Sequence, residues 1–380
     1  MKKLIAACVA AVAAALAFAV PALAQVKVGV IIGTTGPAAG LGIPYKNTFA
    51  ILPKTLGGQP VDYIIRDDAS DPTNAVKFAR DLVVGDKVDV LIGAGTVSSS
   101  LAIADVAAQL KTPQIAMAPV GAEVSKNPWM FASVQPAPLM MAAVAADMKA
   151  HGIKTAGFIG FSDSWGDTVL NGLKAHADAN GVKIVTDQRY GRLDTSVVGQ
   201  VLKVLASNPD AVVLGGSGTP GVLPLMTLRE RGYKGRIYQN HGMVNREFMR
   251  VGTKAWDGVV APAGPVVVAE QLADGAPTKK TAMEFAKLYD QVYGPGTRNS
   301  TSAYSYDTYL IADRAVAEAM KKAKPGTPEF RQAVRDALES SKEVVGTHGV
   351  YNMTANDHVG VDQRAVVLLR AENGDWKLVK

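Results

Sequence analysis

A strand, a glycine turn and a capped helix follow one another within residues 88–110, and this unit limits the chain to few folds. The segment 88–92 (VDVLI) is apolar and rich in β-branched residues, as expected of a buried strand. A turn over 93–97 follows, and the hydroxyls of residues 98–100 can cap a helix. Apolar residues then recur at the spacing of one helix face: Ile103, Val106, Ala107 and Leu110. Free N–H groups at such a helix start suit an anion, although the serines could equally serve only as caps.

The same unit recurs along the chain. Apolar strands end in turns of glycine and small residues at 33–42, 93–98, 118–122, 162–166, 215–219 and 240–242. Alternating strands and helices of this length predict parallel sheets with right-handed crossovers. The pattern restarts after residue 136, so the predicted fold class is α/β with two lobes. Ligands of open α/β sheets bind beyond the carboxyl ends of the strands, so these turns would line a cleft.

The last third of the chain is mostly helical. Helices are expected at 278–293, 300–322 and 328–341, and they have few strands of their own. They are therefore predicted to return to the first lobe. This return would make both lobes discontinuous, with two or three chain crossings between them.

The first 24 residues predict a cleaved export signal. Lys2 and Lys3 precede an apolar stretch over 4–20, and 22–24 (ALA) form a cleavage site before Gln25. A lipoprotein-like match at 5–8 comes too early to predict a lipid anchor. Export without a lipid anchor points to the periplasm.

Composition excludes several classes of protein. Removal of the signal leaves 356 residues (380 minus 24), enough for two domains, and removes the only cysteine. The net charge falls from +6 to +4, because the signal carries two lysines and no acid. That charge is too mild and too evenly spread to predict nucleic-acid binding. No other apolar run is long enough to span a bilayer, and nothing suggests a dimer face, so a monomer is expected.

The motifs that could indicate an enzyme are weak. Residues 216–221 read G-x-G-x-x-G, but no acid follows at the distance a dinucleotide needs, and Pro220 stands where the backbone should approach a phosphate. Ser98 or Ser217 with His241 could suggest a hydrolase, yet the chain has no G-x-S-x-G. The five histidines form no H-x-x-x-H pair. Neither a cofactor, a metal nor catalysis is predicted.

Five segments taken in order resemble a known family. They are K-V-G-V-I-I-G-T-T-G-P-A-A-G-L-G from residue 27, I-R-D-D-A-S-D-P-T-N-A-V from residue 65, L-I-G-A-G-T-V-S-S-S-L-A from residue 91, A-P-V-G-A from residue 118 and F-S-D-S-W-G-D from residue 161. This ordered set is similar to the branched-chain amino-acid (Leu/Ile/Val) binding proteins of ABC importers, which have the type I periplasmic binding fold. The likeness covers the whole mature chain.

The resemblance implies two Rossmann-like lobes joined by a three-strand hinge. Lobe 1 would comprise residues 25–134 and 263–357, and lobe 2 residues 135–262 and 358–380. Hinges would fall near 134–136, 261–264 and 358–361.

The resemblance also implies a ligand-binding set. In the family, hydroxyls after the third strand and the backbone after the fourth bind the ligand's α-carboxylate. Here these positions are Thr96, Ser98, Ser99, Val120, Gly121 and Ala122. Val97 stands where the family often has serine, which leaves Ser98 as the hydroxyl. Leu41 takes the position that stacks on the ligand, and Trp165 is the aromatic residue after the fifth strand, either packing within its lobe or covering the pocket.

One position departs from the family pattern. Typical members have an acid that pairs with the ligand's ammonium, and His241 stands there instead. Imidazole is a poor partner for an ammonium. Asp163 could substitute, so an amino acid stays possible. Equally possible is an aromatic or aliphatic acid without an ammonium, with His241 bonding a second polar group. Ser217 and Gly218, in the turn after another lobe 2 strand, complete the candidate set.

The resemblance therefore predicts a periplasmic solute-binding protein. It would capture a small carboxylate by cleft closure and deliver it to the transmembrane subunits of an ABC permease. An exported ligand sensor and an enzyme on the same scaffold are the alternatives. Replacing Ser98 by alanine should weaken binding sharply if that hydroxyl holds the carboxylate.

Overall fold

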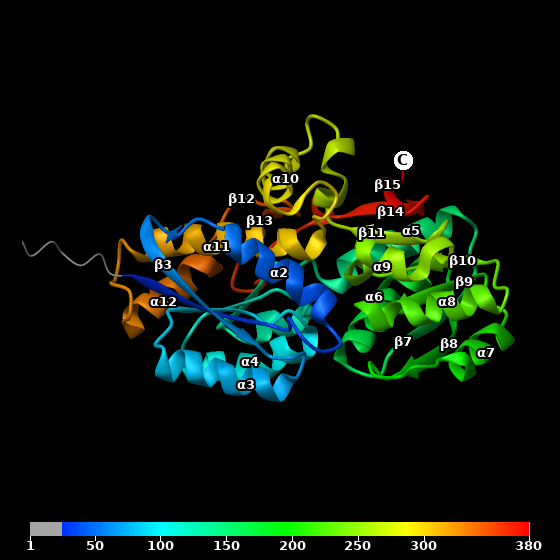
Figure 1. Ribbon diagram of the computed structural model, residues 1–380, viewed down its shortest axis with the longest axis horizontal. Coiled ribbons are helices and arrows are strands. Elements are labelled where there is room, and N and C mark those ends of the chain that lie inside the picture. Colours follow the sequence, from blue (N-terminus) through cyan, green and yellow to red (C-terminus); the bar gives the residue numbers. More distant parts are fainter. Residues whose placement is uncertain (1–24, 380) are drawn as a thin grey trace, which may run out of the picture.

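Two separate β-sheets organise residues 25–379, the part of the chain that this computed structural model describes (Figure 1). Lobe 1 is built on a six-stranded sheet in the order β2-β3-β1-β4-β5-β6. Lobe 2 is built on a seven-stranded sheet in the order β15-β14-β11-β10-β9-β7-β8. The predicted export signal lies outside the described residues. Figure 1 shows the two lobes side by side along the long axis.

The sheet of lobe 1 is parallel apart from its edge hairpin, in which β2 pairs antiparallel with β3. Its central strand, β1, is buried almost throughout, which explains its continuous apolar sequence. The strands are β1 (Val26–Ile32), β2 (Thr55–Leu56), β3 (Gln59–Asp67), β4 (Val90–Gly93), β5 (Gln114–Ala116) and β6 (Met130–Ala132). The intervening helices are α2 (Ala39–Ile51), α3 (Pro72–Arg80), the π-helical turn η1 (Asp81–Gly85), α4 (Val97–Gln109) and η2 (Gly121–Lys126).

The sheet of lobe 2 has a parallel core and an antiparallel edge formed by the end of the chain. Its strands are β7 (Thr155–Phe161), β8 (Lys183–Tyr190), β9 (Ala211–Gly215), β10 (Arg236–Tyr238), β11 (Val260–Ala263), β14 (Val367–Glu372) and β15 (Asp375–Leu378). Its main helices are α5 (Ala137–Ala150), α6 (Ser164–Ala177), α7 (Val198–Ala206), α8 (Leu223–Glu230) and α9 (Arg246–Gly252). Short helices η4 (Thr219–Val222) and η5 (His241–Met243) follow β9 and β10.

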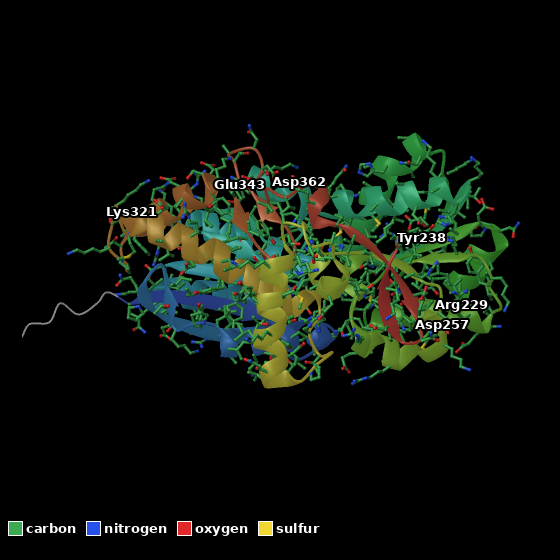
Figure 2. All side chains as sticks on the ribbon, turned by 90° about the horizontal axis from the view of Figure 1, so that it is seen from above. Arg229, Tyr238, Asp257, Lys321, Glu343 and Asp362 are labelled. Atoms are coloured by element: carbon green, nitrogen blue, oxygen red, sulfur yellow. The ribbon has the colours of Figure 1, made fainter. Side chains whose placement is uncertain are left out.

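The helices after residue 266 return to lobe 1. These are α10 (Lys279–Tyr293), α11 (Ser300–Ala319) and α12 (Pro328–Glu339), followed by the small hairpin β12 (Val344–Val345) and β13 (Val350–Tyr351). Helix α11 packs on α2, where the Thr48 hydroxyl donates to the Ser302 carbonyl at 2.8 Å. In Figure 2, Lys321 at the end of this helical layer and Arg229 of lobe 2 lie toward opposite ends of the molecule.

The chain crosses between the lobes after β6, after β11 and before β14. Gln135 connects these crossings: its amide accepts from the Tyr304 hydroxyl at 2.7 Å and donates to the Ala365 carbonyl at 2.9 Å. A Cβ on Gly264 would lie only 2.8 Å from the Gln135 amide nitrogen. The crossings fall near the predicted hinges, and the domain boundaries themselves stay a prediction.

The start of α2 differs from the sequence prediction. Residues 33–42, with glycines at 40 and 42, were predicted to form a turn, whereas α2 already begins at Ala39 and ends at Ile51. A Cβ on Gly42 would lie 1.9 Å from the Gly33 carbonyl oxygen, so only glycine lets α2 start this close to the end of β1. Tertiary packing thus overrides the low helix propensity of glycine.

The helices of residues 25–379 include none with the length and apolar character needed to cross a membrane.

Candidate ligand-binding site

A cavity enclosing about 450 Å³ of space lies between the two lobes, where strand ends of both sheets meet. Lobe 1 contributes Leu41, Tyr45, Gly95, Thr96, Val97, Met117, Pro119, Val134, Thr301 and Tyr304. Lobe 2 contributes Trp165, Arg192, Ser217, His241 and Gly242. The mainly apolar wall carries a few polar groups, as small-molecule sites usually do.

Five residues of the predicted ligand-binding set line this cavity: Leu41, Thr96, Trp165, Ser217 and His241. The topology brings them together from the ends of different strands, as expected for an α/β cleft. Their roles as ligand contacts stay predictions.

The other predicted residues lie around the cavity without forming its described wall. After β5 the wall is formed by Pro119 rather than by Val120 or Gly121. Gly218 lies one residue beyond the lining residue Ser217, and Ala122 belongs to the short helix η2. Ser98, Ser99 and Asp163 have structural contacts that the next paragraphs describe.

Thr96, and not the serines that follow it, caps helix α4. Its backbone is extended, and its hydroxyl accepts from the Ser99 N–H at 3.3 Å, so the sequence prediction of a serine cap was wrong. Ser100 donates to the Ala94 carbonyl at 2.9 Å, and Ser99 is fully buried. The helix starts two residues earlier than a cap at Ser98 would give, because Thr96 is the last extended residue before it.

Ser98 makes a contact between the lobes. Its hydroxyl lies 2.9 Å from the hydroxyl of Ser164, the first residue of α6. This hydrogen bond joins the start of a lobe 1 helix to the start of a lobe 2 helix. The pair therefore stabilises the arrangement of the lobes in this structure.

Trp165 is only 4 % exposed, and it both packs within lobe 2 and borders the cavity. Its indole N–H donates to the Gly216 carbonyl at 3.2 Å, which fixes the ring within lobe 2. The ring also forms part of the cavity wall and meets the His241 ring edge-on, with centroids 5.6 Å apart. A rigid aromatic wall of this kind suits an apolar ligand.

His241 lines the cavity and is buried, yet neither ring nitrogen has a hydrogen-bond partner among residues 25–379. Burial lowers the pKa of the imidazole to about 4. The ring is therefore neutral at pH 7, with one donor and one acceptor nitrogen. Buried polar groups are costly unless they are paired, so these nitrogens are suited to contact a bound molecule.

Arg192 is a cavity residue that the sequence reasoning missed. Its Nε donates to Asp163 Oδ2 at 2.5 Å, Nη1 lies 3.4 Å from the Ser217 hydroxyl, and the guanidinium sits over the Phe161 ring at 4.3 Å. Its position could have indicated this role, because Arg192 lies two residues after the end of β8. The turn after this strand was not among those predicted to line the cleft.

Asp163, the proposed substitute for the family's acid, is fully engaged. Its Oδ1 caps α6 by accepting from the N–H groups of Trp165 at 3.0 Å and Gly166 at 3.2 Å. Its Oδ2 accepts from Arg192. This carboxylate therefore neutralises a cavity arginine and has little capacity left for an ammonium.

Two tyrosines were also missed as wall residues. Tyr45 donates to the Met117 carbonyl at 2.6 Å, and Tyr304 donates to Gln135 at 2.7 Å. Because both phenol protons are used, the oxygens can act toward the cavity only as acceptors. Tyr304 is buried and lines the cleft between the lobes.

Comparison with known proteins agrees with this geometry. A family model described as periplasmic binding protein matches residues 25–375. The chain belongs to the periplasmic binding protein family. The predicted α/β fold with two lobes and the predicted relation to Leu/Ile/Val-binding proteins are both confirmed. Members of this family and fold are substrate-binding proteins rather than enzymes, and the family implies a periplasmic location.

The similar proteins include curated and structurally solved members. This periplasmic binding protein is 24 % identical over 351 residues to the Leu/Ile/Val-binding protein BraC3 of Rhizobium johnstonii, covering 88 % of this chain and 89 % of the relative. An extracellular ligand-binding receptor from Rhodopseudomonas palustris is 44 % identical, with a TM-score of 0.91 over 94 % of this chain and 99 % of that one.

A more distant member shares the fold. It is a solute-binding protein of an ABC transporter from Rhodopseudomonas palustris BisB5, solved with 3,4-dihydroxybenzoic acid. The two chains are 21 % identical with a TM-score of 0.78, covering 93 % of this chain and 96 % of that one.

Buried histidines predict a loss of stability in acid. Burial lowers the pKa from 6.5 to about 4 for His241 and about 3 for His348, so the unfolded chain binds these protons at a higher pH than the folded chain. Burial raises the pKa of Asp307 from 3.8 to about 6, which acts in the opposite direction. Between pH 6 and pH 4, unfolding lets the two histidines each bind a proton, whereas Asp307 releases the proton that it holds in the folded chain. Unfolding therefore takes up one net proton from these three groups, and the free energy of unfolding should fall by about 1.4 kcal/mol per pH unit as the pH is lowered to 4.

Urea unfolding at half-unit steps from pH 7 to pH 4 measures this slope. His241→Asn should flatten this slope, because the variant lacks the imidazole that binds a proton in the unfolded chain but not in the folded chain. An identical slope in the His241 variant would show that this imidazole titrates normally.

Proposed function

We propose that this protein is the solute-binding component of an ABC importer, and that it captures a small carboxylate by closing its lobes and delivers it to a membrane permease. The observation that carries the proposal is the cavity between the lobes, whose walls come from both sheets. A ligand in this position contacts both lobes only when they are closed. Its binding energy therefore selects the closed form, which a permease can distinguish from the open one.

The lobes already contact each other around the cavity. Ser98 bonds Ser164, and a Cβ on Gly40 at the start of α2 would lie 2.9 Å from the Phe248 ring of α9. We propose that rotation occurs at the crossings near 134–136, 261–264 and 358–361, because there the chain passes between lobes. With only three connections, closure requires few backbone changes.

The cavity offers enough interactions for useful affinity. A hydrogen bond to a charged group contributes roughly 1.5–3 kcal/mol, and micromolar binding requires about 8 kcal/mol. Three such bonds to a carboxylate, with an apolar body against the cavity wall, reach this range. No covalent step is required.

Calorimetry with a panel of small carboxylates tests the proposal. The panel contains leucine, isoleucine, valine, benzoate, 3,4-dihydroxybenzoate and succinate, and small-angle scattering follows closure. At least one compound should bind with micromolar affinity and reduce the radius of gyration. Binding by none of them, or binding at this cavity without compaction, would contradict the proposal.

The hydroxyl pair between the lobes gives a separate prediction. Ser98→Ala removes one hydrogen bond of the closed state, worth about 0.5–1.5 kcal/mol, so affinity should fall roughly 2- to 10-fold. Ser164→Ala should have the same effect, and the double variant should be no weaker than either single variant. Calorimetry on the three variants measures this coupling. A loss much larger for Ser98→Ala than for Ser164→Ala would show instead that Ser98 holds the ligand directly, as the family resemblance implies.

A further inference from the structure

The hydroxyls at the start of α4, where the family resemblance places the carboxylate, offer little at the described cavity wall. Thr96 lines that wall; its oxygen accepts from the Ser99 N–H to cap the helix, and its own proton is free to be donated. Ser98 pairs with Ser164 of the other lobe. Ser99 has a buried hydroxyl with no hydrogen-bond partner among residues 25–379, but it does not belong to the described wall. The position that often carries the family serine is Val97, whose side chain cannot bond an anion. At this helix start, lobe 1 therefore offers a carboxylate one side-chain hydroxyl at the described wall, fewer than the resemblance implies.

Lobe 2 offers a cation at the cavity wall. Arg192 has five N–H donors, and its hydrogen bonds to other described side chains occupy only Nε, toward Asp163, and Nη1, toward Ser217. The stacking of the guanidinium on Phe161 fixes its plane. A guanidinium held in this way is preorganised to bind a carboxylate with its remaining donors.

Two neighbouring side chains lack partners that an anionic group would supply. Ser217 accepts from Arg192, so its own proton is free to be donated. His241 is only 3 % exposed, lines the same cavity and has no partner on either ring nitrogen among the residues that the structure describes. A carboxylate beside Arg192 can accept from the hydroxyl and from one imidazole N–H. The imidazole is thus a second observation, independent of Arg192, that favours an anionic group at this part of the wall.

The ammonium group of an amino-acid ligand would find no acidic partner at the described wall of the cavity. None of the described wall residues is an acid, and the nearby Asp163 is shared between Arg192 and the cap of α6. A ligand ammonium near its own carboxylate would also lie near the arginine, where like charges repel. The wall on lobe 1 is mainly apolar, with Leu41 and Met117, and it includes the two wall tyrosines.

We propose that this protein binds a carboxylate that carries an apolar body and no amino group, with the carboxylate on lobe 2 at Arg192, Ser217 and His241. This inference rests on the proposed function of the same cavity. The apolar body extends toward lobe 1, where the oxygens of Tyr45 and Tyr304 accept from a ligand hydroxyl if one is present. The ligand is therefore oriented opposite to the arrangement that the family resemblance implies.

Matched ligand pairs that differ only in the amino group test the chemical class. 4-Methylpentanoate is leucine without its amine, and 3-phenylpropanoate is phenylalanine without its amine. In calorimetry, at least one amine-free acid should bind more than tenfold tighter than its amino acid. 3-Phenylpropanamide, which keeps the shape of the acid but not its charge, should bind at least tenfold more weakly than 3-phenylpropanoate.

Variants test the location of the carboxylate. Arg192→Gln should weaken binding of the preferred acid about 30- to 100-fold, as expected for the loss of a charged hydrogen-bonded contact, and should abolish the preference for acid over amide. Arg189→Gln is the matched control, because Arg189 is a lobe 2 arginine paired with Asp187 and Asp167 outside the cavity wall. The control should bind as tightly as the wild type. Circular dichroism and melting curves verify that both variants are folded.

The outcomes separate this inference from the proposed function. If leucine or phenylalanine binds more tightly than its amine-free partner, the inference fails while the solute-binding function stands. The same holds if folded Arg192→Gln keeps the full preference for acid over amide. If no acid or amino acid binds at all, the proposed function itself fails. The comparison of ligand pairs uses the unaltered protein, so it decides the chemical class even if the arginine variant does not fold.

Discussion

Gly264→Ala is expected to destabilise the protein by about 3 kcal/mol, at the upper end of what overpacking a core usually costs. A Cβ at this position would lie 1.7 Å from the His348 Nδ1. The imidazole has little room to move, because it stacks on Tyr304 with centroids 4.0 Å apart and its Nε2 bonds the Ser300 carbonyl. Thermal unfolding should show a fall in melting temperature of roughly 5–10 °C.

Gly199→Ala provides the matched control. This glycine lies inside α7 with no atom near its missing Cβ, so alanine there should be neutral or stabilising by roughly 0.4–1 kcal/mol. Adding His348→Ala to the Gly264 variant should restore part of the lost stability, because the clashing ring is gone. A Gly264 variant as stable as the wild type would mean that the second crossing is loosely packed.

The second large effect is expected at the cavity wall. Trp165→Ala should weaken the preferred carboxylate by 100-fold or more, since truncating a buried aromatic anchor typically costs at least about 2–4 kcal/mol. The indole forms a wall of the cavity and sets the position of the His241 ring. Trp165→Phe keeps an aromatic wall and should lose roughly 10-fold or less. Calorimetry measures both affinities.

Trp256→Phe separates effects on affinity from effects on folding. Trp256 is also a buried lobe 2 tryptophan whose indole N–H donates to a backbone carbonyl, that of Phe248 at 3.1 Å. It does not belong to the described wall of the cavity. Trp256→Phe and Trp165→Phe should therefore lose similar stability, while only the variants at 165 change affinity. If Trp165→Ala binds the ligand as tightly as Trp256→Phe does, Trp165 serves lobe packing alone.

Part of the site was predictable because its residues stand next to strand ends. Thr96 and His241 follow β4 and β10, and parallel strands bring such ends to one edge of a sheet. Arg192 was missed because its position is fixed by residues distant in the sequence. These are Asp163, 29 residues earlier, and the ring of Phe161, which the guanidinium covers. Tyr304 was missed because it reaches the cavity from α11, a helix that returns to lobe 1 late in the chain.

Local details of the helices were predicted less well. The serines after β4 looked like caps, yet the backbone at Thr96 is extended and its hydroxyl takes that role. The glycines before Tyr45 looked like a loop, yet they lie in α2 because they allow contact with Gly33 and Phe248. In both cases residues distant in the sequence decide where the helix begins.

The α/β class, the succession of strands and helices, and the family could all be predicted from the order of residues. These properties depend on the spacing of apolar residues and on turn residues, which act between close neighbours along the chain. The folded arrangement was needed to see which hydroxyls remain available beside the cavity and that a paired arginine forms part of its wall. Hydrogen bonds such as Ser98–Ser164 and Arg192–Asp163 join residues far apart in sequence, so no local pattern encodes them.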